Sequence, residues 1–246
     1  PEPTEENLEE LKKFVVLEKA DFGVGYDGDG DRAAFIDETG RYVKGDEALM
    51  IFAKRYLSEN KGGKVVFEVC CSSAVEEIVK SMGGQPIVSR VGHAFIMDKM
   101  IEENAAVGGE ISSHFYFSDI YGFDDAIYAT LKMAETIRVT GKKLSELLNE
   151  LPKYYSIPVR KYDCPDEYKF KIVSEIADYF KRKGIKTLTI DGVKVFTDKG
   201  WFLIRPSNTL PQIKMVAEAK TREDLEEIVK AVSYTHLRAH ETEADL

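Results

Sequence analysis

An acidic loop dominates this sequence, with the letters YDGDGDR at positions 26–32. Its three aspartates occupy alternate positions, and the glycines between them let the backbone turn tightly enough for the carboxylates to converge. The apolar runs 20–26 and 33–36 on either side are typical of strands, so we expect the loop to join two strands. Converging carboxylates repel one another unless a cation lies between them, and oxygen ligands of this kind suit Mg²⁺ or Ca²⁺.

Three interpretations of the acidic loop are open. The first is a solvated turn, because Asp and Gly are common turn residues. The second is a calcium-binding EF-hand loop, with Asp27, Asp29 and Asp31 at its first, third and fifth positions and Glu38 at the twelfth. Against it, the sixth position, which needs glycine, is Arg32, and a strand rather than a helix precedes the loop. The third, which we favour, is a Mg²⁺ site for phosphoryl transfer, with the three aspartates as metal ligands and Arg32 as a catalytic cation for phosphate oxygens.

Composition narrows the possible partners. The 246 residues carry a formal net charge of −9, and the acidic balance argues against a nucleic-acid partner, whose phosphates call for a basic surface. No apolar run approaches the length of a membrane span. The three cysteines, Cys70, Cys71 and Cys164, imply no disulfide framework, so we expect a cytoplasmic protein.

The chain reads as three structured parts and a tail. Residues 1–41 hold a short helix and the strand–loop–strand that carries the acidic loop. Residues 42–152 alternate strands with helices, which predicts an α/β domain with a parallel sheet. Residues 153–232 place strands in a row between two helices, which predicts an α+β domain with a largely antiparallel sheet. The helical periodicity ends near Ser233, so we expect residues 233–246 to be disordered or a non-native extension.

One helix of the α/β domain has a specific predicted orientation. Residues 124–139 show the helical period, and their large aliphatic side chains recur on one side. We therefore expect this side to face the core, with Ile127, Leu131, Ala134 and Ile137 directed inward.

Two polar stretches in residues 42–152 follow predicted strands, where α/β proteins place their ligands. Arg90 and His93 flank the start of a predicted helix, whose N-terminus attracts phosphate; a solvated Arg and a capping His explain the pattern equally well. Glu110, Ser112 and His114 alternate, so on an extended chain they project from one side. They suit recognition of sugar hydroxyls, with His114 available for proton transfer, although a solvent-facing strand explains them as well.

A third polar stretch lies in residues 153–232. Arg205, Ser207, Asn208 and Thr209 fall within five residues on a turn between predicted strands. Together they offer several hydrogen-bond donors to one phosphate group. A polar hairpin with no ligand is the alternative interpretation.

These motifs resemble those of the α-D-phosphohexomutases, the family of phosphomannomutase and phosphoglucomutase. The acidic loop is similar to the family's metal-binding loop. Residues 90–93 (RVGH) resemble its Lys-Thr-Gly-His segment, residues 109–114 (GEISSH) its sugar-specificity loop, and residues 205–211 (RPSNTLP) its phosphate-binding loop. Residues 121–125 (YGFDD) resemble the phosphomannomutase/phosphoglucomutase branch more than the phosphoglucosamine mutases. The resemblance spans about residues 7–232.

The resemblance implies a fold, a reaction and roles for the matched residues. Residues 1–41 would end the second mutase domain, 42–152 would form the third and 153–232 the fourth. The family transfers a phosphoryl group between a Mg²⁺-bound phosphoserine and a hexose phosphate through a hexose 1,6-bisphosphate. The residues that match metal-binding positions are Asp27, Asp29 and Asp31; those that match catalytic positions are Arg32, His93 and His114; those that match substrate-binding positions are Arg90, Glu110, Ser112, His114, Arg205, Ser207, Asn208 and Thr209.

The sequence also departs from the family. The phosphoserine segment, of the Thr-Ala-Ser-His-Asn-Pro type, occurs nowhere in the chain, so we expect no mutase activity and weak Mg²⁺ binding from this chain alone. Cys70 stands where relatives commonly have a substrate-facing Lys, and we expect Arg90 or another group to replace that charge. Ser113 replaces a glycine of the sugar loop, which restricts its backbone.

Other functional classes remain as alternatives. A phosphoglucosamine mutase is one, and a non-catalytic phosphosugar-binding module or a calcium-binding module are the others. Folding driven by Ca²⁺ would favour the calcium-binding module, and phosphosugar binding without turnover by a complete protein would favour the non-catalytic one. For the favoured mutase, the acidic loop and the three polar stretches are all expected to border one phosphosugar cavity.

Overall fold

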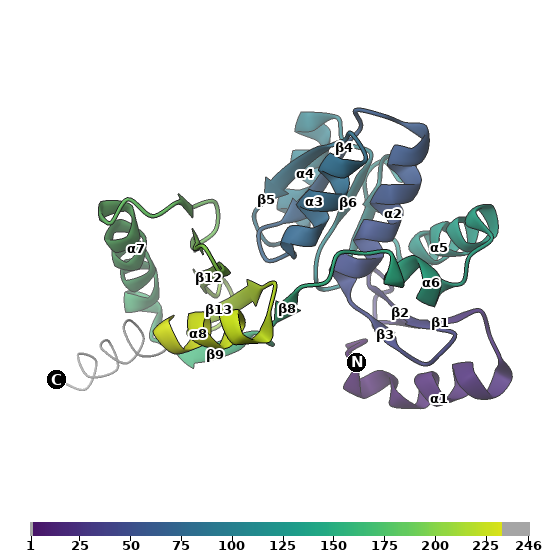
Figure 1. The fold of residues 1–246 in the computed structure, drawn as a ribbon, viewed down its shortest axis with the longest axis horizontal. Helices are drawn as coiled ribbons and strands as arrows, with labels where there is room; N and C mark the ends of the chain where they lie inside the picture. Colours follow the sequence, from purple (N-terminus) through teal and green to yellow (C-terminus); the bar gives the residue numbers. More distant parts are fainter. Residues whose placement is uncertain (1, 233–246) are drawn as a thin grey trace. The chain divides into compact units, whose positions relative to one another are not determined.

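The computed structural model describes residues 2–232, which divide between Pro152 and Lys153 into two compact units. Figure 1 shows the elements of both units in chain order. The expected tail, residues 233–246, lies outside the described residues.

The first unit opens with a small antiparallel sheet that carries the acidic loop. Its strands run in the order β1-β2-β3, and the loop connects β1 to β2. One face of β1 is made of glycine because η1 and α1 lie directly on it: a Cβ on Gly23 would lie 2.5 Å from Val15 of α1, and one on Gly25 would lie 2.4 Å from Leu8 of η1. The elements are η1 (Glu6–Leu8), α1 (Glu9–Glu18), β1 (Phe22–Tyr26), β2 (Ala33–Asp37) and β3 (Tyr42–Val43).

The rest of the first unit is an α/β arrangement around a second sheet. Its strands run in the order β5-β4-β6-β7, with β4 parallel to both neighbours and β7 antiparallel to β6. The apolar run of β4 is buried between helices, as expected for a strand covered on both faces. The elements are α2 (Gly45–Glu59), β4 (Lys64–Glu68), α3 (Ser73–Ser81), β5 (Gln85–Ser89), α4 (His93–Glu103), β6 (Val107–Gly109), β7 (Phe115–Phe117), η2 (Ser118–Ile120), α5 (Ala126–Thr140) and α6 (Leu144–Asn149).

The predicted inward face of α5 is wrong. Ile127 and Leu131 are 65% and 61% exposed, and Ala134 is exposed as well. The buried positions are Ala126, Ala129, Met133 and Thr136. This face lies against α2, β2 and β7, where small side chains let the helix approach closely.

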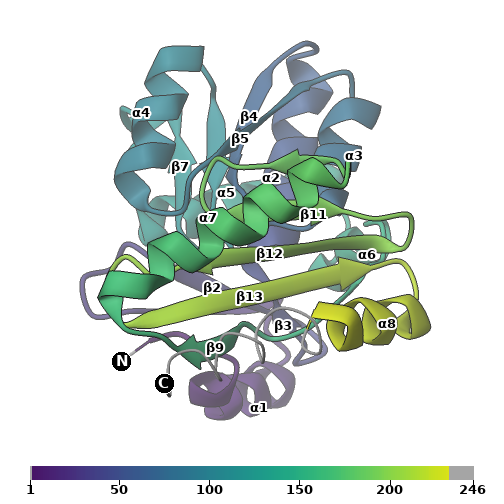
Figure 2. The same ribbon diagram turned by 90° about the vertical axis from the view of Figure 1, so that its left-hand side faces the viewer.

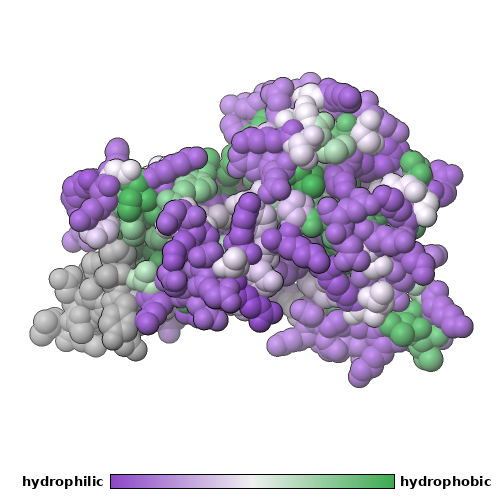
Figure 3. All heavy atoms as spheres, in the orientation of Figure 1, coloured by the Kyte–Doolittle hydropathy of each residue, from purple (hydrophilic) through white to green (hydrophobic). Residues whose placement is uncertain are grey.

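Helix α1 likewise leaves large apolar side chains exposed. Phe14 and Leu17 are 60% and 74% exposed, and a hydrophobic patch lies over this helix in Figure 3. Aliphatic or aromatic residues at helical spacing therefore do not identify the buried face of α1 or α5, because two faces of a helix can share the same period.

The second unit is an antiparallel sheet covered by two helices. Its strands run in the order β10-β11-β12-β13-β8, and β9 also pairs with β13. Helices α7 and α8 pack on the sheet, as Figure 2 shows, and enclose a core that includes Val173, Phe180 and Phe202. The elements are β8 (Tyr155–Ser156), β9 (Arg160–Asp163), α7 (Asp166–Arg182), β10 (Thr187–Leu188), β11 (Val193–Phe196), β12 (Gly200–Pro206), β13 (Gln212–Ala219) and α8 (Arg222–Val232).

The predicted fold class is confirmed. A mainly parallel α/β sheet precedes an α+β sheet that is antiparallel throughout its described pairings. Within residues 2–232, no helix combines the length and the apolar character that crossing a membrane requires.

Candidate functional site

The acidic loop is folded around Asp27, whose side chain is only 1% exposed. Its Oδ1 accepts hydrogen bonds from the backbone N–H groups of Gly30 (3.2 Å) and Arg32 (3.1 Å), and its Oδ2 accepts one from Arg32 Nε at 2.5 Å. Burial alone would raise the pKa of Asp27, but the hydrogen bonds from Arg32 outweigh it and hold that pKa well below its usual range. Asp27 is therefore a permanent anion that shapes the loop as well as a candidate metal ligand.

The three aspartates converge as the sequence predicts for a cation site. One carboxylate oxygen from each of Asp27, Asp29 and Asp31 lies within 4.8 Å of the others. Oδ1 of Asp31 is buried and has no hydrogen-bond partner among the described residues. Burial, followed by the neighbouring Asp27, raises the pKa of Asp31. Three hard oxygen donors with one orphaned atom fit a small divalent cation such as Mg²⁺.

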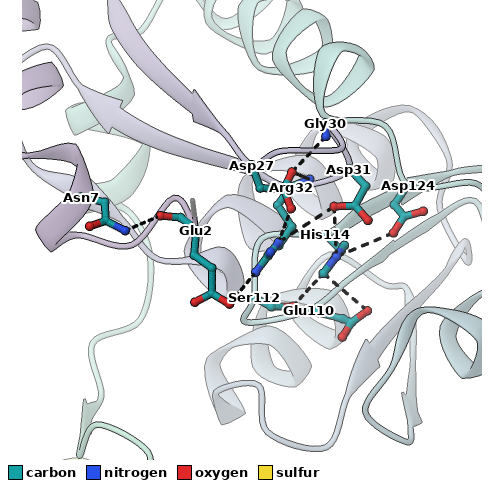
Figure 4. A network of polar contacts seen from close by, with 10 residues as sticks. All are labelled: Glu2, Asn7, Asp27, Gly30, Asp31, Arg32, Glu110, Ser112, His114 and Asp124. Atoms are coloured by element: carbon teal, nitrogen blue, oxygen red, sulfur yellow. Dashed lines mark hydrogen bonds and ion pairs between the residues drawn. The ribbon is translucent and has the colours of Figure 1, made fainter. Parts of the chain in front are cut away.

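The backbone joins the acidic loop to the predicted sugar loop. Arg32 and His114 face each other in an antiparallel β-bridge, and the N–H of Ala33 donates to the carbonyl of Ser113 at 3.0 Å. The N–H of Ala126, the first residue of α5, donates to the carbonyl of Gly30 at 3.2 Å. Two stretches that are far apart in sequence thus meet in one network (Figure 4).

The sugar loop is a turn rather than the extended chain that the alternation suggested. The N–H of Ser113 donates to the carbonyl of Glu110 at 3.2 Å, and the N–H of Glu110 donates to the carbonyl of His114 at 3.1 Å. Its three candidate side chains nevertheless gather around the imidazole of His114. Nδ1 of His114 lies 2.8 Å from Ser112 Oγ and 4.0 Å from Glu110 Oε1.

Three residues that sequence reasoning did not single out hold this turn in place. Glu68, 1% exposed at the end of β4, accepts a hydrogen bond from the N–H of Ile111 at 2.8 Å. The buried Tyr116 donates its hydroxyl proton to Glu110 Oε1. Gly45 lies under the turn, where a Cβ would lie 2.5 Å from the carbonyl oxygen of Glu110. Of these three residues only Glu68 has a signal in the sequence, because it is a charged residue at the end of an apolar run.

Arg90 and His93 lie at the start of α4, as predicted. His93 is the first helical residue and is exposed, and Gly92 before it adopts a φ of 124°. The exposed guanidinium of Arg90 stacks on the ring of Phe95, with 4.3 Å to the ring centroid. Among the described residues, no hydrogen bond or ion pair joins Arg90 or His93 to the acidic loop.

The fourth predicted stretch forms the β12–β13 hairpin of the second unit. Asn208 and Thr209 are exposed at its tip, whereas Ser207 is buried and accepts a hydrogen bond from the N–H of Leu210 at 3.2 Å. Arg205 is buried, with its Nη2 3.1 Å from Asp191 Oδ2, and its Nε has no hydrogen-bond partner among the described residues. For binding a phosphate, the hairpin therefore presents the exposed side chains of Asn208 and Thr209 and the guanidinium of Arg205, whose charge Asp191 partly neutralises.

Comparison with known proteins assigns a family to this arrangement. Residues 44–155 match the family described as "Phosphoglucomutase/phosphomannomutase, alpha/beta/alpha domain III", and residues 161–233 match "Phosphoglucomutase/phosphomannomutase, C-terminal domain". The chain therefore belongs to the phosphoglucomutase/phosphomannomutase family.

Individual relatives agree with this assignment. The "Phosphoglucomutase/phosphomannomutase" of Thermococcus kodakarensis is 38% identical over 94% of this chain and 50% of its own length. The "Phosphomannomutase/phosphoglucomutase" of Pseudomonas aeruginosa is 35% identical over 97% of this chain and 52% of its own length. The crystal structure of a family protein from Burkholderia thailandensis superimposes with a TM-score of 0.83 at 31% identity, covering 92% of this chain and 48% of that one. The chain thus spans about half the length of the curated relatives it matches.

Proposed function

We propose that this chain supplies the metal-, sugar- and phosphate-binding parts of a phosphohexomutase that interconverts hexose 1-phosphate and hexose 6-phosphate. The hexose is glucose, mannose or both, and the reaction passes through a phosphoserine and a hexose 1,6-bisphosphate. The observation that carries the proposal is the β-bridge between Arg32 and His114. It sets a cation-binding loop suited to a phosphoryl group beside a polar turn suited to sugar hydroxyls, and the names of the relatives fit that pairing.

The residues of the first unit have separable roles in this reaction. Mg²⁺ bound by Asp27, Asp29 and Asp31 would supply positive charge to the phosphoryl oxygens. Arg32 adds a fixed cation beside that charge, since Asp27 holds its guanidinium in place. His114 moves a proton at a sugar oxygen, because its Nε2 lies 3.5 Å from Asp31 Oδ1 of the acidic loop and so close to the phosphoryl site.

The remaining predicted residues bind the substrate. Glu110 and Ser112 accept and donate hydrogen bonds to the sugar hydroxyls. Arg90 and His93 attract phosphate at the N-terminus of α4, where the unpaired N–H groups add to their charge. The hairpin residues proposed to hold the phosphate that does not react are Arg205, Ser207, Asn208 and Thr209.

A hybrid enzyme tests the proposal. In it, residues 8–232 of this chain replace the matching half of the Thermococcus kodakarensis relative, which supplies the remaining half. We expect Mg²⁺-dependent turnover of glucose 1-phosphate or mannose 1-phosphate, and Asp31→Asn in the hybrid should lower kcat at least about hundredfold. Glucosamine 1-phosphate is assayed beside them, and preferred turnover of it would assign the chain to the phosphoglucosamine mutases instead.

The chain alone provides the complementary test. It lacks a matching phosphoserine segment, so we expect no turnover of either hexose phosphate without the other half. Turnover by the purified chain would contradict this expectation. A folded hybrid that binds hexose phosphate without converting it would favour a non-catalytic binding protein, and stabilisation by Ca²⁺ but not Mg²⁺ would favour a calcium-binding module. We also propose a cytoplasmic location, since the spacing of Cys70, Cys71 and Cys164 in the sequence implies no disulfide framework.

A further inference from the structure

The imidazole of His114 faces two carboxylates without forming a hydrogen bond to either. Its Nε2 lies 3.5 Å from Asp31 Oδ1 and 4.0 Å from Asp124 Oδ2, both longer than the N–H···O range. Figure 4 shows both carboxylates directed at the ring, one from the acidic loop and one from the segment before α5. One ligand atom from each of the three residues lies within 4.8 Å of the others.

The other ring nitrogen is already engaged. Nδ1 of His114 lies 2.8 Å from Ser112 Oγ, so the imidazole can donate the Nδ1 proton to that hydroxyl. With its proton on Nδ1, the neutral ring presents the lone pair of Nε2 to Asp31 and Asp124. Metal-binding histidines are oriented in this way, by a hydrogen bond from the nitrogen that does not bind the metal. The β-bridge to Arg32 further fixes the position of His114.

The spacing of the three atoms suits a metal ion better than an ion pair. A protonated His114 held by two carboxylates would draw at least one oxygen to about 2.7–2.9 Å, the usual length of a charge-assisted hydrogen bond. Nitrogen and oxygen ligands at about 2.0–2.1 Å from a tetrahedral ion are separated by about 3.3 Å. The separation of 3.5 Å is close to that value, and the one of 4.0 Å exceeds it by about 0.7 Å. The buried Oδ1 of Asp31, which has no hydrogen-bond partner among residues 2–232, would gain a partner by coordinating the metal ion.

We propose that His114, Asp31 and Asp124 form a second metal site, which takes a transition-metal ion of the Zn²⁺ type. One imidazole and two carboxylates favour Zn²⁺ or Co²⁺ over Mg²⁺, which prefers oxygen ligands alone. The site shares Asp31 with the acidic loop, so the two ions compete. A bound Zn²⁺ also occupies the imidazole of His114. The site itself is independent of the mutase function, since it rests only on these three side chains.

Cobalt offers a direct probe, because its visible absorption reports the ligand geometry. The purified 246-residue chain is titrated with Co²⁺ and, by calorimetry, with Zn²⁺. We expect one Co²⁺ to give the absorption of a four- or five-coordinate ion. His114→Gln and Asp124→Asn should each weaken Co²⁺ and Zn²⁺ binding at least tenfold, while circular dichroism confirms that both variants fold.

Two matched variants separate this site from its neighbours. His93→Gln removes an exposed histidine of α4, and Asp98→Asn removes an exposed carboxylate of the same helix that belongs to neither metal cluster; both should keep the Co²⁺ spectrum. Unchanged Co²⁺ binding in folded His114→Gln would overturn the proposal, because the ion would then lie elsewhere. If excess Mg²⁺ left Zn²⁺ binding unaffected, the two ions would not compete, and the proposed sharing of Asp31 would be wrong. Failure of the hybrid enzyme to turn over hexose phosphates would leave the Co²⁺ result intact, so the two proposals fail separately.

Discussion

The hydroxyl of Tyr116 donates a hydrogen bond to Glu110 Oε1 with an oxygen–oxygen distance of 2.5 Å, and the two residues are 0% and 4% exposed. Burial, and then the charge of Glu110, raises the pKa of Tyr116, so the phenol stays protonated and remains a donor. Tyr116 thus fixes one carboxylate oxygen of Glu110, whose other oxygen is the one proposed to accept a hydrogen bond from a sugar hydroxyl. The orientation of a proposed sugar-binding residue thus depends on a residue that no ligand would touch.

Replacing Tyr116 by Phe tests this dependence. The buried carboxylate of Glu110 would lose its phenol donor, which should destabilise the chain by about 1–3 kcal/mol. In the hybrid enzyme we expect KM for hexose phosphate to rise more than kcat falls, because Glu110 would bind the sugar without taking part in proton transfer. Urea unfolding and steady-state kinetics measure the two effects. Tyr128→Phe, which removes the exposed hydroxyl bonded to Asp119, is the matched control. It should change neither the unfolding free energy nor KM by much.

Gly45 is predicted to tolerate no side chain, because the backbone of the sugar loop lies where a Cβ would be. A positive φ is not the reason. A Cβ there would lie 2.5 Å from the carbonyl oxygen of Glu110 and 2.7 Å from that of Ile111. Gly45→Ala should therefore push the sugar loop away and cost about 1–3 kcal/mol, as overpacking does. Amide NMR signals of residues 110–114 should shift together. Gly83→Ala, at a turn with a φ of 77° and open space, should cost about 1 kcal/mol and leave those signals in place; equal shifts in both variants would refute the argument.

Ser113 carries a strain that glycine would not. Its φ of 72° lies in the left-handed region, and its side chain, 2% exposed, interacts with the hydroxyl of Tyr42. Ser113→Ala keeps the strain and loses the hydrogen bond, whereas Ser113→Gly loses the bond but relieves the strain. We expect the Gly variant to be more stable than the Ala variant by about 1 kcal/mol. Thermal unfolding of the two variants measures the difference, and an Ala variant as stable as the Gly variant would show that the turn is unstrained.

Sequence reasoning succeeded where the determinants are local. Asp27, Asp29 and Asp31 converge because glycines lie between them, and strand and helix order follows from residue periodicity. It failed where the determinants come from distant segments. The N–H of Ile111 is held by Glu68, and no spacing along the chain marks that pair. The β-bridge that joins the acidic loop to the sugar loop is equally a product of tertiary packing.

The contacts of Glu150 with two lysines are predicted to make a pH-dependent contribution to stability. Hydrogen bonds from Lys142 and from Lys54, the second at 2.9 Å, lower the pKa of Glu150 to about 2 from its ordinary 4.5. Because the folded-state pKa is the lower one, the stabilisation is complete above pH 4.5 and is lost as the pH falls toward 2. The side chain is 39% exposed, so solvent screening limits the gain to about 1 kcal/mol or less.

Unfolding of the wild type and Glu150→Gln at several pH values checks this expectation. The difference in unfolding free energy should be constant from neutral pH down to about pH 5 and shrink below it. High salt should reduce the difference at neutral pH. A difference that grew on acidification would contradict the assigned direction of the pKa shift.

Helix α5 offers a paired test of which face is buried. Met133 is 0% exposed and Leu131 is 61% exposed, although they lie only two residues apart on the same helix. Met133→Ala should open a cavity and cost about 2–5 kcal/mol, while Leu131→Ala removes little buried area and should cost less than about 1 kcal/mol. Because alanine has a higher helix propensity than methionine or leucine, neither loss of stability can come from a weaker helix. Urea unfolding gives both values, and a Leu131→Ala loss as large as that of Met133→Ala would show that the aliphatic side of α5 is covered in solution.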